Sequence, residues 1–136
     1  MAWPCEAMPL PISAANGAKI PVVLLVEDEF FVRYDIASCL REAGYVVVES
    51  ANGEEAIAHC RSGARIDMVF TDINLCGSTT GWDVAECFRM ERPDTLLLYM
   101  SGNCVDLERC VPGSVFVAKP LQHSDILNAC QRLPGK

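Results

Sequence analysis

The most constraining feature of this 136-residue chain is a run of five apolar residues that leads directly into three carboxylates. The run, Val22 to Val26, contains three β-branched valines and is followed by Glu27, Asp28 and Glu29. It is too short to cross a membrane and is typical of a strand buried on both faces of a parallel sheet. Ligands bind at the carboxyl ends of such strands, so this junction is the first candidate site. Carboxylates crowded there repel one another unless a cation joins them.

Strand and helix patterns then alternate along the chain. Further apolar runs predict strands at residues 45–48, 67–71, 95–100 and 115–118. Apolar residues at helical spacing predict helices over residues 29–43, 54–60, 81–92 and 124–133. The segment 104–110 leaves room for only about two helical turns. This alternation predicts right-handed βαβ units and an α/β fold, a doubly wound sheet of five parallel strands in the order 2-1-3-4-5 with a short or irregular fourth helix.

Length and charge limit the function classes. The chain is long enough for one domain, which we place at residues 20–136, and the proline-containing residues 1–19 predict an irregular leader. A net charge of −7 argues against direct contact with nucleic acid. No apolar run approaches the length of a membrane span, and no secretory signal is recognisable, so we expect a cytoplasmic protein.

The eight cysteines lack the spacing of a zinc site. Without an export signal, we expect most of them to be reduced core residues rather than a disulfide framework. Cys39, Cys60 and Cys130 occupy apolar helical positions, whereas Cys5 and Cys76 are expected to be more exposed.

Reactive residues follow four of the five predicted strands. In the predicted order, strands one and three flank the point where the winding reverses, which brings Glu27, Asp28 and Asp72 round one crevice. Three carboxylates with open space between them suit Mg²⁺, with waters completing the coordination. Ser101 and Lys119 follow the fourth and fifth strands, and a hydroxyl donor with a point charge suits a bound phosphoryl group.

Four motifs at these strand ends together resemble the receiver domain of bacterial two-component response regulators. They occur in the family's order and with near-family spacing, and the resemblance covers about residues 20–134. In this sequence they read Leu24-Leu25-Val26-Glu27-Asp28-Glu29, Val69-Phe70-Thr71-Asp72, Tyr99-Met100-Ser101-Gly102 and Val117-Ala118-Lys119-Pro120. The sequence contains no output domain after the region of resemblance, so we expect a stand-alone, single-domain receiver with a flavodoxin-like fold.

The resemblance implies a role for each residue of the predicted site. Asp72 is expected to be the phosphoacceptor, a carboxylate nucleophile that forms an aspartyl phosphate. Glu27 and Asp28 are expected to hold Mg²⁺ together with Asp72 and the backbone carbonyl of Asn74. Lys119 is expected to pair first with Asp72 and then with the phosphate.

Ser101 and Phe116 are the expected switch residues of the resemblance. The resemblance implies that Ser101 moves to hydrogen-bond the phosphoryl oxygen and that Phe116 then turns inward. Phosphorylation is thus expected to shift a pre-existing equilibrium in the surface near strands four and five. The alternative for Phe116 is an ordinary core position. Asn74 and Asn103 match positions at which family members tune phosphate lifetime, although asparagine is common in loops of any function.

The sequence departs from the family pattern beside the phosphoacceptor. Glu27 stands where aspartate is more usual, and its longer side chain is still expected to reach the metal, directly or through water. Cys76 replaces the usual proline, in a loop that is one residue longer than usual.

The favoured hypothesis is a Mg²⁺-dependent phospho-accepting switch in a histidine-to-aspartate relay. Its expected donor is a sensor histidine kinase or a histidine phosphotransfer protein, and it would control a downstream protein or drain phosphate from a kinase. It would not be an enzyme beyond its own phosphorylation and dephosphorylation, and it would be a monomer or weak dimer without membrane contact. The alternatives are a degenerate receiver that acts as a constitutive interaction module, and a haloacid-type phosphatase, which would need a second acid at the position of Asn74.

Overall fold

The computed structural model describes residues 20–102 and 109–131. The strands in these ranges are β1 (Val22–Val26), β2 (Val46–Ser50), β3 (Met68–Asp72), β4 (Leu96–Ser101) and β5 (Val115–Ala118). The helices are α2 (Phe30–Glu42), α3 (Gly53–Arg61), α4 (Gly81–Glu91) and α5 (His123–Cys130). The expectations for residues 1–19 and for Asn103 lie outside the described residues, as does nearly all of the expected short helix 104–110.

All five strands pair in parallel, in the order β2-β1-β3-β4-β5, which confirms the predicted doubly wound sheet. β1 lies between β2 and β3, and Val26 pairs with Ser50 on one side and Thr71 on the other. This register brings the residues that follow β1 to the same edge of the sheet as Asp72, at the point where the winding reverses.

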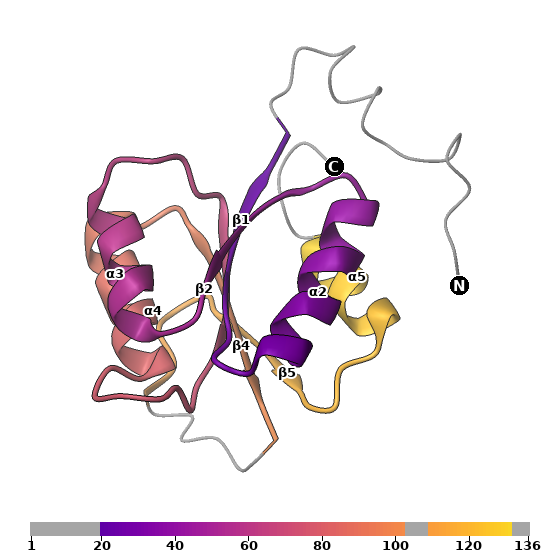
Figure 1. The fold of residues 1–136 in the computed structure, drawn as a ribbon. Helices are drawn as coiled ribbons and strands as arrows, with labels where there is room; N and C mark the ends of the chain where they lie inside the picture. The colour runs from indigo at the N-terminus through magenta and orange to yellow at the C-terminus, as the bar shows by residue number, and fades with distance from the viewer. Residues whose placement is uncertain (1–19, 103–108, 132–136) are drawn as a thin grey trace.

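Helices cover both faces of the sheet, α2 and α5 on one face and α3 and α4 on the other (Figure 1). Val23 and Leu25 belong to the core beneath α2 and α5, whereas Leu24 and Val26 belong to the core beneath α3 and α4. Successive side chains of a strand point to opposite faces, so a strand covered on both faces is apolar throughout. The uninterrupted apolar run of β1 follows from this position at the centre of the molecule.

The structure extends three of the predicted strands at their carboxyl ends. β2 continues through Ser50, β3 includes Asp72, and β4 includes Ser101. Strand pairing uses backbone groups, so polar side chains do not end it. Two of the predicted site residues are therefore the last residues of strands, where the sheet holds their backbone.

The described cysteines follow the expected burial. Cys39, Cys60 and Cys130 are buried, and Cys76 is exposed. Among the helices in the described ranges, none combines the length and the apolar character that crossing a membrane requires.

Candidate functional site

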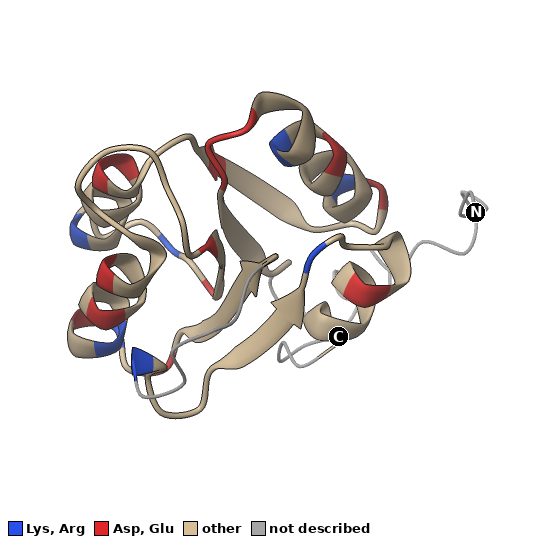
Figure 2. Ribbon diagram, turned by 90° about the horizontal axis from the view of Figure 1, so that it is seen from below, with Lys and Arg blue, Asp and Glu red and all other residues tan. Residues whose placement is uncertain are grey.

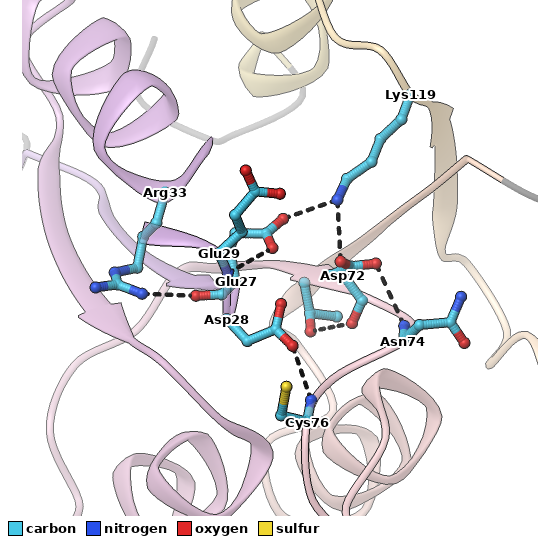
Figure 3. Close-up of polar contacts among 9 residues, drawn as sticks. Glu27, Asp28, Glu29, Arg33, Asp72, Asn74, Cys76 and Lys119 are labelled. Atoms are coloured by element: carbon cyan, nitrogen blue, oxygen red, sulfur yellow. Dashed lines mark hydrogen bonds and ion pairs between the residues drawn. The ribbon is translucent and has the colours of Figure 1, made fainter. Parts of the chain in front are cut away.

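Glu27, Asp28 and Asp72 converge at the carboxyl edge of the sheet. One carboxylate oxygen from each lies within 4.8 Å of the others. Glu27 is 1% exposed and Asp72 is 7% exposed, whereas Asp28 is half-buried. Figure 2 looks onto this edge, where acidic segments gather, and the close-up in Figure 3 shows the three carboxylates together. Their juxtaposition, which strand order alone predicts, is present in the structure.

Lys119 bridges two of the three carboxylates. Its Nζ donates to Glu27 Oε1 at 2.9 Å and to Asp72 Oδ2 at 3.0 Å (Figure 3). The lysine directly follows β5, and its backbone N–H donates to the Ser101 carbonyl at 2.9 Å, which fixes where the side chain begins. When all four groups are ionised, the three carboxylates and the Lys119 ammonium together carry a net charge of −2. One divalent cation would balance that charge.

Burial and hydrogen bonding oppose each other at these groups. Burial raises the pKa of Glu27 above its usual value, and hydrogen bonds from Lys119 and a backbone N–H offset this only in part. Burial also acts to raise the pKa of Asp28, but several hydrogen bonds, led by those from Cys76, together hold that pKa below its usual value. Burial acts to lower the pKa of Lys119, but the hydrogen bonds to Glu27 and Asp72, together with the charges of these carboxylates, raise that pKa above its usual value. The ionised form of Glu27 is therefore disfavoured by burial and is stabilised by a nearby cation.

The loop after β3 returns over the carboxylates. The Asn74 backbone N–H donates to Asp72 Oδ1 at 3.3 Å, and the Cys76 backbone N–H donates to Asp28 Oδ2 at 2.9 Å (Figure 3). A proline at position 76 would have no N–H to donate. The cysteine that departs from the expected pattern therefore supplies a direct link between the loop and the acidic cluster.

Gly81, which no sequence motif marks, lies against the backbone of Asp72 and Ile73. Its N–H donates to the Ile73 carbonyl at 2.8 Å. A Cβ atom at position 81 would lie 2.7 Å from Ile73 Cα and closer still to the Asp72 carbonyl oxygen. These are backbone atoms, so they cannot rotate away as a side chain can, and only glycine permits this approach. A lone glycine at a helix start gives no sequence signal of such a contact.

Arg33 is a second residue that the sequence did not reveal. Its Nη1 donates to the Glu27 carbonyl at 2.8 Å, and its Nε donates to Glu49 Oε1 at 3.2 Å. The arginine therefore joins α2 to the end of β1, as Figure 3 shows. Its bond to Glu49 also joins α2 to β2. An arginine on an amphipathic helix is ordinarily a solvent-facing residue, which is why the pattern did not mark it.

The two expected switch residues differ in environment. Ser101 is 3% exposed, and it lies one residue beyond Met100, which pairs with Asp72. Phe116, in the neighbouring strand β5, has 38% of its surface exposed. The alternative of an ordinary core position for Phe116 is therefore wrong, because its ring faces outward in this structure.

Replacing Lys119 by methionine is expected to destabilise the metal-free protein by about 2–4 kcal/mol near neutral pH, because two buried carboxylates lose their cation. The folded-state pKa of Glu27 lies above its usual value. Protonation of Glu27 therefore stabilises the folded state fully at pH values below the unfolded-state pKa, and this stabilisation is lost as pH rises through the folded-state pKa. Without the hydrogen bond from Lys119, that pKa rises further. The loss measured by urea unfolding should therefore be smaller at pH of about 5 than at about 7.5.

The matched control is Arg61→Met, which removes a cation from the exposed ion pair with Glu91. It should change stability little at either pH, because exposed pairs contribute little. Added Mg²⁺ should recover part of the Lys119→Met loss. An equal loss for Lys119→Met at both pH values would contradict the assigned electrostatics.

The sequence profile of the response regulator receiver domain matches residues 23–131. Transcriptional regulatory protein PdtaR of Mycobacterium tuberculosis is 28% identical over 125 residues, which are 89% of this chain and 60% of PdtaR. Sensor kinase CckA of Brucella abortus is 33% identical over 119 residues, 84% of this chain and 12% of the kinase. The chain thus spans less than two thirds of the length of either relative.

Solved structures share the fold. The crystal structure of a response regulator receiver protein from Sinorhizobium medicae matches with a TM-score of 0.79 and 33% identity, covering 87% of this chain and 98% of that one. The chemotaxis protein CheY4 of Vibrio cholerae matches with a TM-score of 0.75 and 26% identity, covering 85% of this chain and 99% of that one.

Proposed function

Because this chain belongs to the response regulator receiver domain family, the phosphate-accepting switches of two-component systems, we propose that it accepts a phosphoryl group on Asp72 in a Mg²⁺-dependent reaction. One observation carries the proposal. The Asp72 carboxylate is buried, is held by Lys119 and by the Asn74 N–H, and lies within 4.8 Å of two further carboxylates. Two further buried or half-buried carboxylates beside Asp72 repel it, so the cluster is unfavourable for a purely structural aspartate and favourable for a bound cation.

Phosphoryl transfer would use Asp72 as the nucleophile. A carboxylate oxygen of Asp72 forms the new bond to phosphorus while the bond between phosphorus and the donor's leaving group breaks, and the leaving group keeps that electron pair. Lys119 Nζ already lies 3.0 Å from Asp72 Oδ2, so its charge is in place to stabilise the phosphoryl oxygens. The Ser101 hydroxyl, at the same edge, would donate to one of those oxygens in the product.

The carboxylate set fits a hard divalent cation. Glu27, Asp28 and Asp72 would hold Mg²⁺ with the Asn74 carbonyl, since all of these are oxygen ligands. When bound, the ion supplies neutralisation of the charge on the transferring phosphoryl group. The role of this chain's own residues is to keep the three carboxylates close together. Lys119 and the loop N–H groups do this by offsetting the repulsion between the like-charged carboxylates.

The experiment is incubation of the protein with acetyl phosphate, with and without Mg²⁺, read by intact mass. We expect one phosphoryl adduct that requires Mg²⁺. Asp28→Asn should slow its formation on the order of tenfold or more at limiting Mg²⁺ while leaving the acceptor for the Cys76 N–H in place. Asp35→Asn, which alters an exposed acid paired with His123, is the control. A folded protein without an adduct would instead support the constitutive interaction module.

The proposed donor in the cell is a sensor histidine kinase or a histidine phosphotransfer protein. Receiver domains act with histidine kinases and downstream targets, and the match to part of sensor kinase CckA supports a place in such a relay. Transfer from a purified, autophosphorylated histidine kinase should label the chain and consume no more than one phosphoryl group per molecule before hydrolysis. Sustained turnover of small phosphate esters would contradict this non-enzymatic role and favour the phosphatase alternative.

We assign the switch role to Phe116 on its exposure and its position beside β4. Phosphorylation should draw the ring inward toward the space that Ser101 vacates, as burial of an aromatic side chain is favourable. In a Phe116→Trp variant, the added fluorescence should shift to shorter wavelength when the adduct forms, after subtraction of the wild-type signal from the two native tryptophans. Complete phosphorylation without any such shift would remove Phe116 from the switch.

A further inference from the structure

Two cysteines on facing helices lie side by side on the face of the sheet away from α2 and α5. Cys60 of α3 and Cys87 of α4 have sulfur atoms 3.7 Å apart. Cys60 is 3% exposed, and Cys87 is half-buried. The site described above uses neither of them.

Polar contacts connect α3 to α4 and the residue after it, close to this cysteine pair. Arg92 Nε, just past α4, donates to the Cys60 carbonyl at 3.0 Å. Arg61 Nε and Glu91 Oε2 form an ion pair at 3.1 Å, one residue from Cys60 and four from Cys87. A disulfide needs the sulfurs at about 2.05 Å, so the two side chains must close a gap of less than two ångströms by rotation. The sulfur atoms already lie near each other, so the approach that remains is short.

We propose that Cys60 and Cys87 are a redox modification site that closes to a reversible intramolecular disulfide when the chain meets a peroxide. Cys87, the more accessible thiol, attacks one peroxide oxygen; the O–O bond breaks, giving the Cys87 sulfenic acid and water. The Cys60 sulfur then attacks the Cys87 sulfur, the S–O bond breaks, and the hydroxide leaves with the Cys60 proton as water. Two thiols are oxidised, and one peroxide is reduced to two waters.

The environment of each sulfur sets this order. Burial, with a contribution from the neighbouring Cys87, raises the pKa of Cys60 to about 12, so it is a poor first target for an oxidant in solution. Its proximity to Cys87 gives it a high effective concentration as the second nucleophile. The sulfenic acid of Cys87 should therefore be captured by Cys60 before any other thiol reaches it.

The crosslink would tie together two helices that frame the phosphoacceptor. The first residue of α4, Gly81, abuts the Asp72 carbonyl, and the first residue of α3, Gly53, abuts Thr79 in the loop after β3. Thr79 Oγ1 also donates to Glu54 Oε2 at 2.9 Å. Oxidation should thus stiffen the scaffold of the site and stabilise the folded chain, because the bond also restricts the unfolded state.

In the test, the 136-residue chain is treated with a small molar excess of hydrogen peroxide. Free thiols are then blocked by alkylation, and peptides are mapped after digestion. Trypsin releases the peptide that ends at Arg61, and chymotrypsin cuts after Trp82, which separates Cys87 from Cys76. We expect a Cys60–Cys87 linked peptide that dithiothreitol abolishes, with a rise in melting temperature of about 5 °C or more before reduction.

Variants make the result decisive. Cys87→Ser and Cys60→Ala should each lose both the linked peptide and the rise in melting temperature, whereas Cys76→Ser, at an exposed cysteine outside the pair, should keep both. If Cys60→Ala folds poorly, Cys87→Ser still tests the proposal, because Cys87 is only half-buried and its replacement should preserve the fold. Three results would overturn the proposal. Cys60 could still be alkylated after peroxide treatment, Cys87 could be oxidised to a sulfinic acid, or Cys87 could form a disulfide with a different cysteine.

Discussion

Replacing Asp72 by asparagine is expected to abolish the phosphoryl adduct, with labelling by acetyl phosphate at least about a hundredfold below wild type. The amide is not a nucleophile toward phosphorus, and the change removes one of three carboxylates from the cation site. The amide oxygen can still accept from Lys119 Nζ or from the Asn74 N–H, so the fold should be retained. The measurement is the rate of adduct formation by intact mass in Mg²⁺.

The control for this variant is Asp94→Asn, a change of the same chemistry at an exposed turn position. It should be labelled at the wild-type rate. Urea unfolding should show that Asp72→Asn is as stable as wild type to within about 1 kcal/mol, which separates loss of the acceptor from loss of the fold. Undiminished labelling of Asp72→Asn would place the phosphoryl group on another residue.

Replacing Gly81 by alanine is expected to destabilise the protein by about 3 kcal/mol or more. The added Cβ would lie 2.7 Å from Ile73 Cα and closer to the Asp72 carbonyl oxygen, both parts of the backbone. Either α4 shifts away from β3 or the end of β3 bends, and the Gly81 N–H to Ile73 carbonyl bond at 2.8 Å is strained in both cases. Because the bend moves Asp72 itself, labelling by acetyl phosphate should also fall.

Gly102→Ala is the matched control for this substitution. Its new Cβ would lie 3.8 Å from Lys119 Cβ, an ordinary van der Waals contact, and its φ is not in the left-handed region. Its stability should change by no more than about 0.5 kcal/mol in the same urea titration. Equal stability of Gly81→Ala and wild type would show that α4 can move away from Asp72 without cost.

The sheet and its covering helices follow from patterns that are local in sequence. A buried parallel strand has to be apolar on both faces, so the run at β1 marks its central place before any partner is known. The chirality of βαβ crossovers then leaves few topologies, and the predicted order 2-1-3-4-5 agrees with the structure. The carboxylate cluster follows from that order, since the ends of β1 and β3 must meet.

Contacts that depend on the exact distance between elements were not predictable in the same way. The approach of Gly81 to the Asp72 carbonyl depends on how deeply α4 seats against β3, which no residue pattern encodes. The bond from the Cys76 N–H to Asp28 depends on the path of a loop, and backbone donors are the same for every residue except proline. The exposure of Phe116 could not be predicted from the sequence either, because an aromatic residue in a strand is ordinarily a core residue.

The most direct test of the account is chemical identification of the phosphorylated residue. After labelling by acetyl phosphate in Mg²⁺, borohydride reduces an acyl phosphate to the alcohol and so converts a phosphorylated aspartate to homoserine, which peptide sequencing by mass spectrometry locates. Homoserine is expected at position 72, only in samples that contained both Mg²⁺ and the donor. Homoserine at position 28, its reduced-glutamate equivalent at position 27, or a stable phosphate on Ser101 would contradict the assignment of Asp72 as the phosphoacceptor.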